Sequence, residues 1–157
     1  MEKQMREHVH ENEILIDRPI AVVHGYVSQP WRWHEWHPAS ESAAPGHHPL
    51  QAGAQFDEVA SMQPLAMLPI RMRSHLHWTV LASAPPYLLE MRASSKRIDV
   101  HVCYEMDQQA MTRFRRVFRF RVKGWLRFVE HYFLPARMRA QSVLALDNLK
   151  RVLEAQP

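Results

Sequence analysis

The alternation of hydrophobic and polar residues is clearest in the last third of the chain. Between Thr112 and Val122, apolar residues alternate with arginines: Phe114, Phe118, Phe120 and Val122 against Arg113, Arg115, Arg119 and Arg121. A period of two is typical of a strand that buries one face. The amphipathic stretch from about Pro135 to Ala155 predicts a long closing helix. We therefore expect an antiparallel sheet folded around a terminal helix, which favours a cavity for an apolar ligand over a catalytic motif.

The same period of two predicts more strands upstream. They cover Val9 to Asp17, Gln55 to Ser61, Arg71 to Ala82, Tyr87 to Ser94 and Ile98 to Asp107. Pro19 fits the first position of a helix, so Ile20 to Val27 is expected to be a short helix. Trp31 to His37 is expected to be a second short helix or turn. The segment Ala39 to Ala54 contains two prolines and two glycines and is interpreted as a loop.

Composition indicates one ordinary globular domain. The 157 residues are 46% hydrophobic and 23% charged, enough for a core in a single domain spanning 1–157. The charged start lacks the apolar centre of a signal peptide, and no apolar run is long enough to cross a bilayer. These features predict a soluble, cytoplasmic protein. A net charge of +4, with acids and bases interspersed, gives only weak support for binding to nucleic acid or membranes.

Short motifs at the element boundaries resemble a known superfamily. They are Ile16-Asp17-Arg18-Pro19, Trp33-His34-Glu35-Trp36-His37-Pro38, Leu50-Gln51-Ala52-Gly53-Ala54-Gln55-Phe56, and Trp78-Thr79-Val80 followed by Pro85-Pro86. Together with the order of elements, they resemble the helix-grip fold of the START/SRPBCC superfamily, in particular its polyketide cyclase/dehydrase and lipid-transfer branch. The resemblance covers nearly the whole chain. It implies an α+β fold in which a curved antiparallel sheet of six or seven strands wraps around a long C-terminal helix, with two short helices after the first strand.

The strand count leaves one question open. The residue pattern predicts six strands where the superfamily usually has seven. Either a strand lies within Met62 to Ile70, or an edge of the sheet is shortened.

The resemblance further implies an apolar cavity between sheet and helix, opening under the two short helices. Family members bind lipids, isoprenoids, polyketides and hormones, and some are cyclases or hydrolases. The candidate ligand-binding residues are Trp33, Trp36, His37, Phe56, Trp78, Met91, Tyr104, Phe114, Arg116, Phe118 and Met138. Each apolar member could instead only fill the core, because burial alone explains apolar stripes at strand spacing. A ligand site of this kind should measure at least roughly 300 Å³.

Arg116 stands out because it is in phase with Phe114, Phe118 and Phe120. An unpaired charge on a buried face is costly, so Arg116 should meet a carboxylate, a ligand anion or water at the cavity mouth. A strand bulge that turns it outward beside Arg115 is an equal alternative.

Two other polar candidates also have alternative interpretations. The hydroxyl of Tyr104 could donate to a ligand carbonyl or only pack locally. His37 could act as a general acid or base, or form a structural hydrogen bond at the end of its helix.

No metal or cofactor is expected. His34 and His37 are three residues apart and are followed by a proline, which is not zincin spacing. His75, His77 and His101 could share a strand face, but no convincing ligand set is identifiable. The four glycines are too scattered for a phosphate loop, which argues against nucleotide chemistry. Cys103 has acidic neighbours in sequence that should raise its pKa, so an inert thiol is predicted.

The segment 123–135 supports a second functional class. It interleaves aromatic and basic residues in a way typical of membrane-interface segments, although it could also form the packed first turns of the closing helix. The arginines of 112–122 are separated from the phenylalanines, which argues against nucleic acid.

The function predicted from sequence is binding of a small hydrophobic molecule, such as a lipid, isoprenoid, polyketide or aromatic, with cyclase or dehydratase activity as an extension. The alternative is a non-catalytic lipid carrier that contacts membranes transiently. The protein could be a monomer or a homodimer.

Overall fold

The described part of the chain forms one antiparallel sheet, a long C-terminal helix and three short helices. The computed structural model describes residues 5–44, 50–63, 69–128 and 133–157. Its elements are β1 Glu7–Ile16, α1 Ile20–Val27, the 3-10 helix η1 Pro30–Glu35, β2 Ser40–Ala43, β3 Gln55–Met62, β4 Met72–Ala84, β5 Leu88–Ser94, β6 Ile98–Gln108, β7 Thr112–Val122, the 3-10 helix η2 Gly124–Phe128 and α2 Leu134–Glu154.

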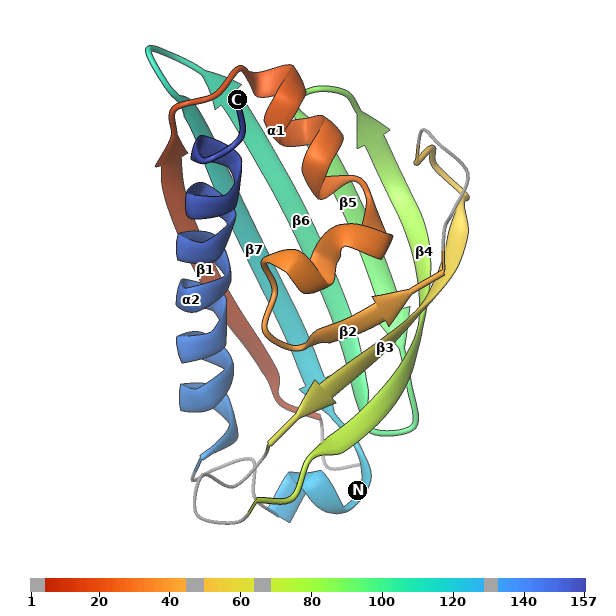
Figure 1. The fold of residues 1–157 in the computed structure, drawn as a ribbon. Coiled ribbons are helices and arrows are strands. Elements are labelled where there is room, and N and C mark those ends of the chain that lie inside the picture. The colour runs from red at the N-terminus through yellow and green to blue at the C-terminus, as the bar shows by residue number, and fades with distance from the viewer. Residues whose placement is uncertain (1–4, 45–49, 64–68, 129–132) are drawn as a thin grey trace.

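The sheet curves around the closing helix. Among the described residues seven strands pair in the order β1-β7-β6-β5-β4-β3-β2, all antiparallel. The first strand therefore lies beside the last, at the edge where α2 packs, and α1 and η1 cover the other half of the concave side (Figure 1). This arrangement is the helix-grip α+β fold that the sequence predicts.

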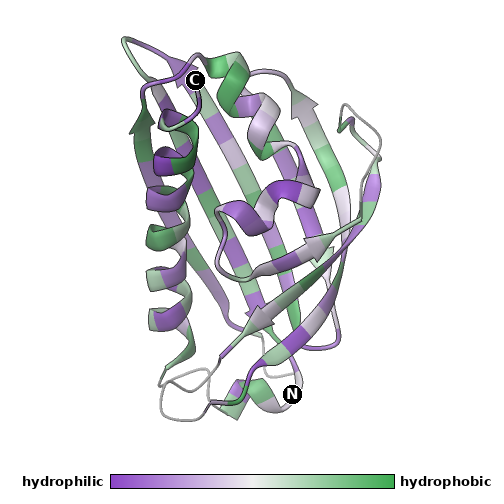
Figure 2. Ribbon diagram, in the orientation of Figure 1, coloured by the Kyte–Doolittle hydropathy of each residue, from purple (hydrophilic) through white to green (hydrophobic). Residues whose placement is uncertain are grey.

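The concave face is apolar because the strands alternate with a period of two. On β6 and β7, Val102 pairs with Phe118 and Val100 with Phe120, and all four side chains are buried. Figure 2 shows the matching bands of hydrophilic and hydrophobic residues along the strands. The inner stripe of α2 adds a further set of buried residues, Leu134, Ala145, Leu146, Leu149 and Leu153. Burial of these two faces against each other supplies most of the driving force for folding.

The arginines on the outer face are matched by acids on neighbouring strands. Arg115 contacts both Glu105, at 2.6 Å, and Glu11, at 2.9 Å. Arg113 lies 2.6 Å from Asp107. Exposed pairs of this kind stabilise a fold only weakly, so their main effect is on the charge of the surface. The arginine face does not present a continuous positive stripe, which weakens the nucleic-acid interpretation.

The strand at the far edge was missed by the sequence-based prediction. The predicted loop Ala39 to Ala54 contains β2, which pairs with β3 across a register shift between Ser40 and Ser42. Its sequence, Ser-Glu-Ser-Ala, has little strand propensity, so pairing with β3 rather than local preference creates this strand. The sequence analysis allowed the missing strand to lie within Met62 to Ile70. Met62 instead ends β3, and residues 64–68 lie outside the described part of the chain.

The two 3-10 helices also differ from expectation. The second short helix occupies Pro30–Glu35 rather than Trp31 to His37. After β7, η2 forms a separate turn of helix and α2 begins only at Leu134, so residues 124–128 are not the first turns of the closing helix.

Candidate functional site

A cavity of about 100 Å³ lies between the concave face and α2. Its wall combines residues from η1, β3, β4, β6, β7 and α2. The lining residues used below are Trp33, His37, Glu58, Ser74, Trp78, Tyr104, Arg116, Phe118, Met138 and Ser142. The wall is therefore mostly apolar, with a small polar group where β7 faces α2.

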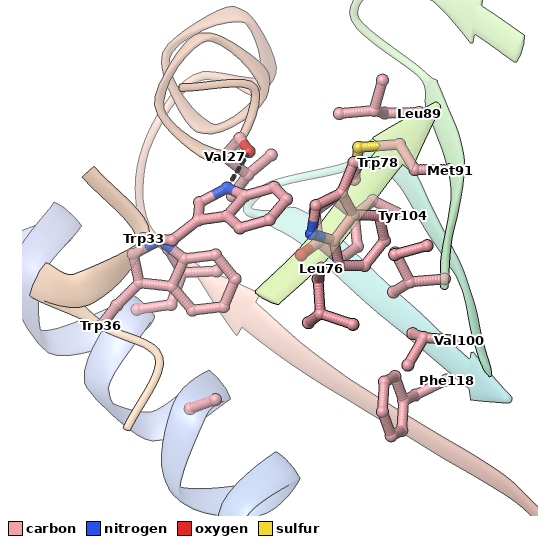
Figure 3. Close-up of a cluster of buried hydrophobic side chains, with 14 of the residues drawn as sticks. Val27, Trp33, Trp36, Leu76, Trp78, Leu89, Met91, Val100, Tyr104 and Phe118 are labelled. Atoms are coloured by element: carbon pink, nitrogen blue, oxygen red, sulfur yellow. Dashed lines mark hydrogen bonds between the residues drawn. The ribbon is translucent and has the colours of Figure 1, made fainter. Parts of the chain in front are cut away.

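Aromatic rings fill one end of this space. The rings of Trp33 and Trp78 point toward each other (Figure 3), with centroids 5.5 Å apart in an edge-to-face arrangement. Phe56 stacks on Trp78 at 6.0 Å. The indole Nε1 of Trp33 donates to the carbonyl oxygen of Val27 at 2.9 Å, which fixes the ring against α1. These contacts make a rigid aromatic cluster that closes one end of the cavity.

Arg116 is the buried cation of the site. Only 4% of the residue is exposed, and β7 runs through it without a bulge, so the alternative in which a bulge turns it outward is wrong. Its guanidinium donates to the Ser142 hydroxyl at 2.9 Å and contacts His37 Nε2 at 3.1 Å. It also lies over the Phe118 ring, 4.6 Å from the centroid. Its Nε has no hydrogen-bond partner among the described residues.

Glu58 brings a buried carboxyl group to the same cavity. It is 6% exposed, and its Oε2 accepts a hydrogen bond of 2.8 Å from Trp78 Nε1. Burial raises the pKa of Glu58, while the Trp78 hydrogen bond and the charge of Arg116 oppose that rise. Among the described residues, Glu58 and Arg116 form no ion pair at contact distance. The two groups interact only through the electrostatic attraction of their charges.

Tyr104 stands beside the cation. It lies directly opposite Arg116 in the β6–β7 register, and burial raises the pKa of its hydroxyl to about 12. The phenol therefore stays protonated at neutral pH and can donate a hydrogen bond.

His37 is held neutral by its surroundings. Burial of the ring and then the charge of Arg116 lower its pKa to about 3. Nδ1 accepts from the Ala39 amide at 3.2 Å while Nε2 faces the Arg116 guanidinium. A neutral imidazole can accept at only one nitrogen, so one of these two contacts stays unsatisfied in either tautomer. This arrangement gives His37 the structural role that the sequence left open and makes it a poor general acid near neutrality.

The structure brings most of the predicted site residues together. Seven line the cavity: Trp33, His37, Trp78, Tyr104, Arg116, Phe118 and Met138. The other four, Trp36, Phe56, Met91 and Phe114, belong to the surrounding core. That the lining residues contact a ligand stays a prediction.

Sequence reasoning missed Glu58 and Ser142. Glu58 shares its strand face with Phe56, the same phase argument that singled out Arg116, so the signal was present in the sequence. Ser142 gives no such signal, because a serine on a helix is usually solvated and only the fold places it opposite Arg116.

The cavity has a volume of about 100 Å³. This volume is smaller than the roughly 300 Å³ expected for such a ligand site. The prediction was wrong because it counted the aromatic residues as walls around a space. Trp33, Trp78 and Phe56 instead pack against one another and occupy much of it.

The paired histidines of β4 and β6 and the cysteine lie on the outer face. His77 pairs with Asp57 at 2.8 Å, and His101 pairs with Glu90 at 2.7 Å. Among the described residues, no group of three or more histidine, cysteine or acidic side chains is placed to hold a metal ion. That the protein binds no metal stays a prediction. Burial and nearby Glu105 raise the pKa of Cys103 to about 11, as expected of an inert thiol. Among the described helices, none has the length and apolar character needed to cross a bilayer.

Solved structures share this fold. The di-domain ARO/CYC BexL from the BE-7585A biosynthetic pathway matches with a TM-score of 0.68 and 12% identity over 96% of this chain; the match covers 51% of BexL, so this chain spans about half that protein. A putative uncharacterized protein from Rhizobium leguminosarum matches with a TM-score of 0.70 and 14% identity, over 98% of both chains. Ara h 8.0201 matches with a TM-score of 0.65 and 12% identity, over 96% of this chain and all of its own. Such low identities support the fold alone.

Sequence comparison gives the family. No curated protein sequence matches the chain. A family model described as "Polyketide cyclase / dehydrase and lipid transport" matches residues 7–154, nearly the whole chain. Together with the helix-grip fold around the cavity, this match establishes that the chain belongs to the polyketide cyclase/dehydrase and lipid-transport family.

Proposed function

We propose that the cavity binds a small hydrophobic molecule whose anionic or enolisable oxygen is held by Arg116. The observation that carries this proposal is the buried guanidinium, whose partners, Ser142, His37 and Tyr104, are all neutral. A buried cation without an anion in contact is costly, and an acidic ligand oxygen would supply that anion. Charge-assisted hydrogen bonds of this kind are among the strongest that a protein makes.

The apolar part of the cavity sets the kind of ligand. A space of about 100 Å³ lined by Trp33, Trp78 and Phe118 suits one ring or a short chain without rearrangement. Larger isoprenoid or polyketide ligands require side chains to move, and Met138 on α2 is the adaptable candidate because methionine has three rotatable bonds.

A cyclase- or dehydratase-type reaction is the second proposal, favoured by the presence of Glu58 and Arg116 in the wall of the same cavity. The Glu58 carboxylate would take a proton from the carbon next to a ligand carbonyl, and the resulting enolate oxygen would lie against Arg116 and Tyr104. In a cyclisation the enolate carbon would attack a second carbonyl of the ligand, and the oxygen of that carbonyl would take the proton back from Glu58. In a dehydration the enolate would expel a hydroxyl from the neighbouring carbon, which leaves as water with the proton from Glu58. The raised pKa of Glu58 suits such a two-way proton transfer.

The carrier alternative uses the same cavity without the proton transfer. It predicts that Glu58→Gln leaves the affinity for the ligand unchanged. It also predicts that the bound molecule is not chemically altered. The expected compartment remains the cytoplasm, and the expected state a monomer or homodimer.

The test pairs ligand identification with matched probes. Native mass spectrometry of protein from its own host should reveal a retained acidic or carbonyl-bearing hydrophobic molecule. Titration calorimetry should give tighter binding for benzoate than for benzyl alcohol, and for hexanoate than for hexanol. Equal affinities within both pairs would contradict a cation-anchored ligand.

A further inference from the structure

The end of the molecule that carries η2 exposes large apolar side chains. Phe128 is 84% exposed, Trp125 53%, and Ile70, just before β4, 59%. Leu126 of the same 3-10 helix is fully buried, so η2 is anchored while its neighbours project outward. Exposed aromatic residues clustered in this way mark an interaction surface.

Cations surround these aromatic residues. A groove of about 700 Å³ is lined by Arg73, His75, Lys96, Arg97, Lys123 and Trp125, and none of the described residues in its wall is acidic. Asp99 pairs with Lys123 at 2.7 Å, and Glu41 pairs with Arg73 at 3.0 Å. In the described part of the chain, Arg71, Lys96, Arg97 and Arg127 have no carboxylate partner. We call this surface, made of Ile70, Arg71, the groove residues, Arg127 and Phe128, the basic aromatic tip.

The tip adjoins the ligand cavity. Pairing between β4 and β5 ends at His77 and Ser94, so β4 continues beyond its partner and leaves the space that forms the groove. The guanidinium of Arg97 donates to the Arg73 carbonyl and holds the β5–β6 turn there. Ser74 lines both the groove and the cavity. A partner that binds the basic aromatic tip therefore lies next to the wall of the cavity.

We propose that the basic aromatic tip docks the protein onto anionic lipid bilayers. Tryptophan and phenylalanine rings insert at the headgroup level, while arginine and lysine side chains bury their stems and reach anionic lipid with their charged ends. The charge complementarity comes from four cations that have no carboxylate partner among the described residues, and the apolar anchors favour a bilayer over a purely acidic protein. The inference goes beyond the proposed function, because docking does not require a bound ligand.

Vesicle flotation tests this proposal on the full chain. The protein should float with vesicles of phosphatidylcholine mixed with phosphatidylserine, and should bind phosphatidylcholine alone at least roughly fivefold more weakly. Lys96→Glu and Phe128→Ser should each lower binding to the anionic vesicles by roughly fivefold or more, and added salt should weaken it further.

The controls replace the same residue types at other places. Tyr87, which is 60% exposed at the β4–β5 turn, and Arg92, exposed on the outer face, lie away from the tip. Tyr87→Ser and Arg92→Glu should therefore leave binding unchanged. Circular dichroism of all four variants should match that of the parent protein. Equal binding to both vesicle types, equal losses in the controls, or binding to polyglutamate but to neither vesicle would overturn the proposal, the last result pointing to an acidic protein partner.

Discussion

Arg116 on β7 donates a hydrogen bond of 2.9 Å to the hydroxyl oxygen of Ser142 on α2. This contact joins the concave face of the sheet to the closing helix across the polar corner of the cavity. A guanidinium has five N–H donors, so a ligand oxygen can bind Arg116 beside that contact. One side chain therefore contacts α2 and also lines the cavity.

Replacing the buried cation should weaken acidic ligands selectively. Arg116→Met keeps much of the side-chain volume and removes a charge-assisted contact worth roughly 1.5 to 3 kcal/mol, so benzoate should bind about 10 to 100 times more weakly. Binding of benzyl alcohol should change little. Titration calorimetry measures both.

The matched control is Arg119→Met. Arg119 lies three residues along the same strand on the outer face, where it is 3.9 Å from Glu7. If both variants lost affinity equally, Arg116 would not be the ligand anchor.

Glu58 should make the protein less stable as pH rises. Its pKa is raised in the folded state above an ordinary value of 4.5, because burial disfavours the charged carboxylate. The folded state then holds the proton more tightly than the unfolded state, and stability falls from about pH 4.5 up to the raised pKa, by up to about 1.4 kcal/mol per pH unit. Glu58→Gln, which can still accept from Trp78, should remove this loss. Urea unfolding at pH 5 and pH 8 measures it.

The control for Glu58 is its neighbour on the outer face. Asp57 is exposed and contacts His77, so Asp57→Asn should leave the loss between pH 5 and pH 8 in place. An identical pH dependence in the parent protein and in Glu58→Gln would show that Glu58 ionises as freely in the folded state as in the unfolded one.

The period of two made the sheet and Arg116 predictable from sequence. Thr112–Val122 forms β7 as expected, and the same phase places Phe114, Arg116 and Phe118 on the concave face. Strand periodicity is a local property that burial of one face enforces, so it can be detected without knowing the partner strands. The resemblance to the helix-grip fold then supplied the closing helix and the position of the cavity.

The rest depended on contacts between distant segments. The four polar and small residues of β2 become a strand only because β3 pairs with them. The volume of the cavity depends on how the rings of Trp33, Phe56 and Trp78 pack, which spans three elements. The sequence left open whether Phe128 is exposed, since an aromatic residue in an amphipathic segment can face either the core or an interface.

Acidification should destabilise the protein through His37. Its pKa is lowered from 6.5 to about 3 by burial and by the charge of Arg116, so the unfolded state binds the proton first. Stability is therefore complete above about pH 6.5 and is lost as pH falls toward 3, by about 1 to 3 kcal/mol between pH 7 and pH 4.5. His37→Gln keeps an acceptor for Arg116 but cannot titrate, so it should reduce this loss, while His34→Gln at the exposed neighbouring position should not. Urea unfolding across this range measures the loss. A loss of the same size in His37→Gln would assign it to His10 and His24, two buried histidines whose pKa values burial also lowers.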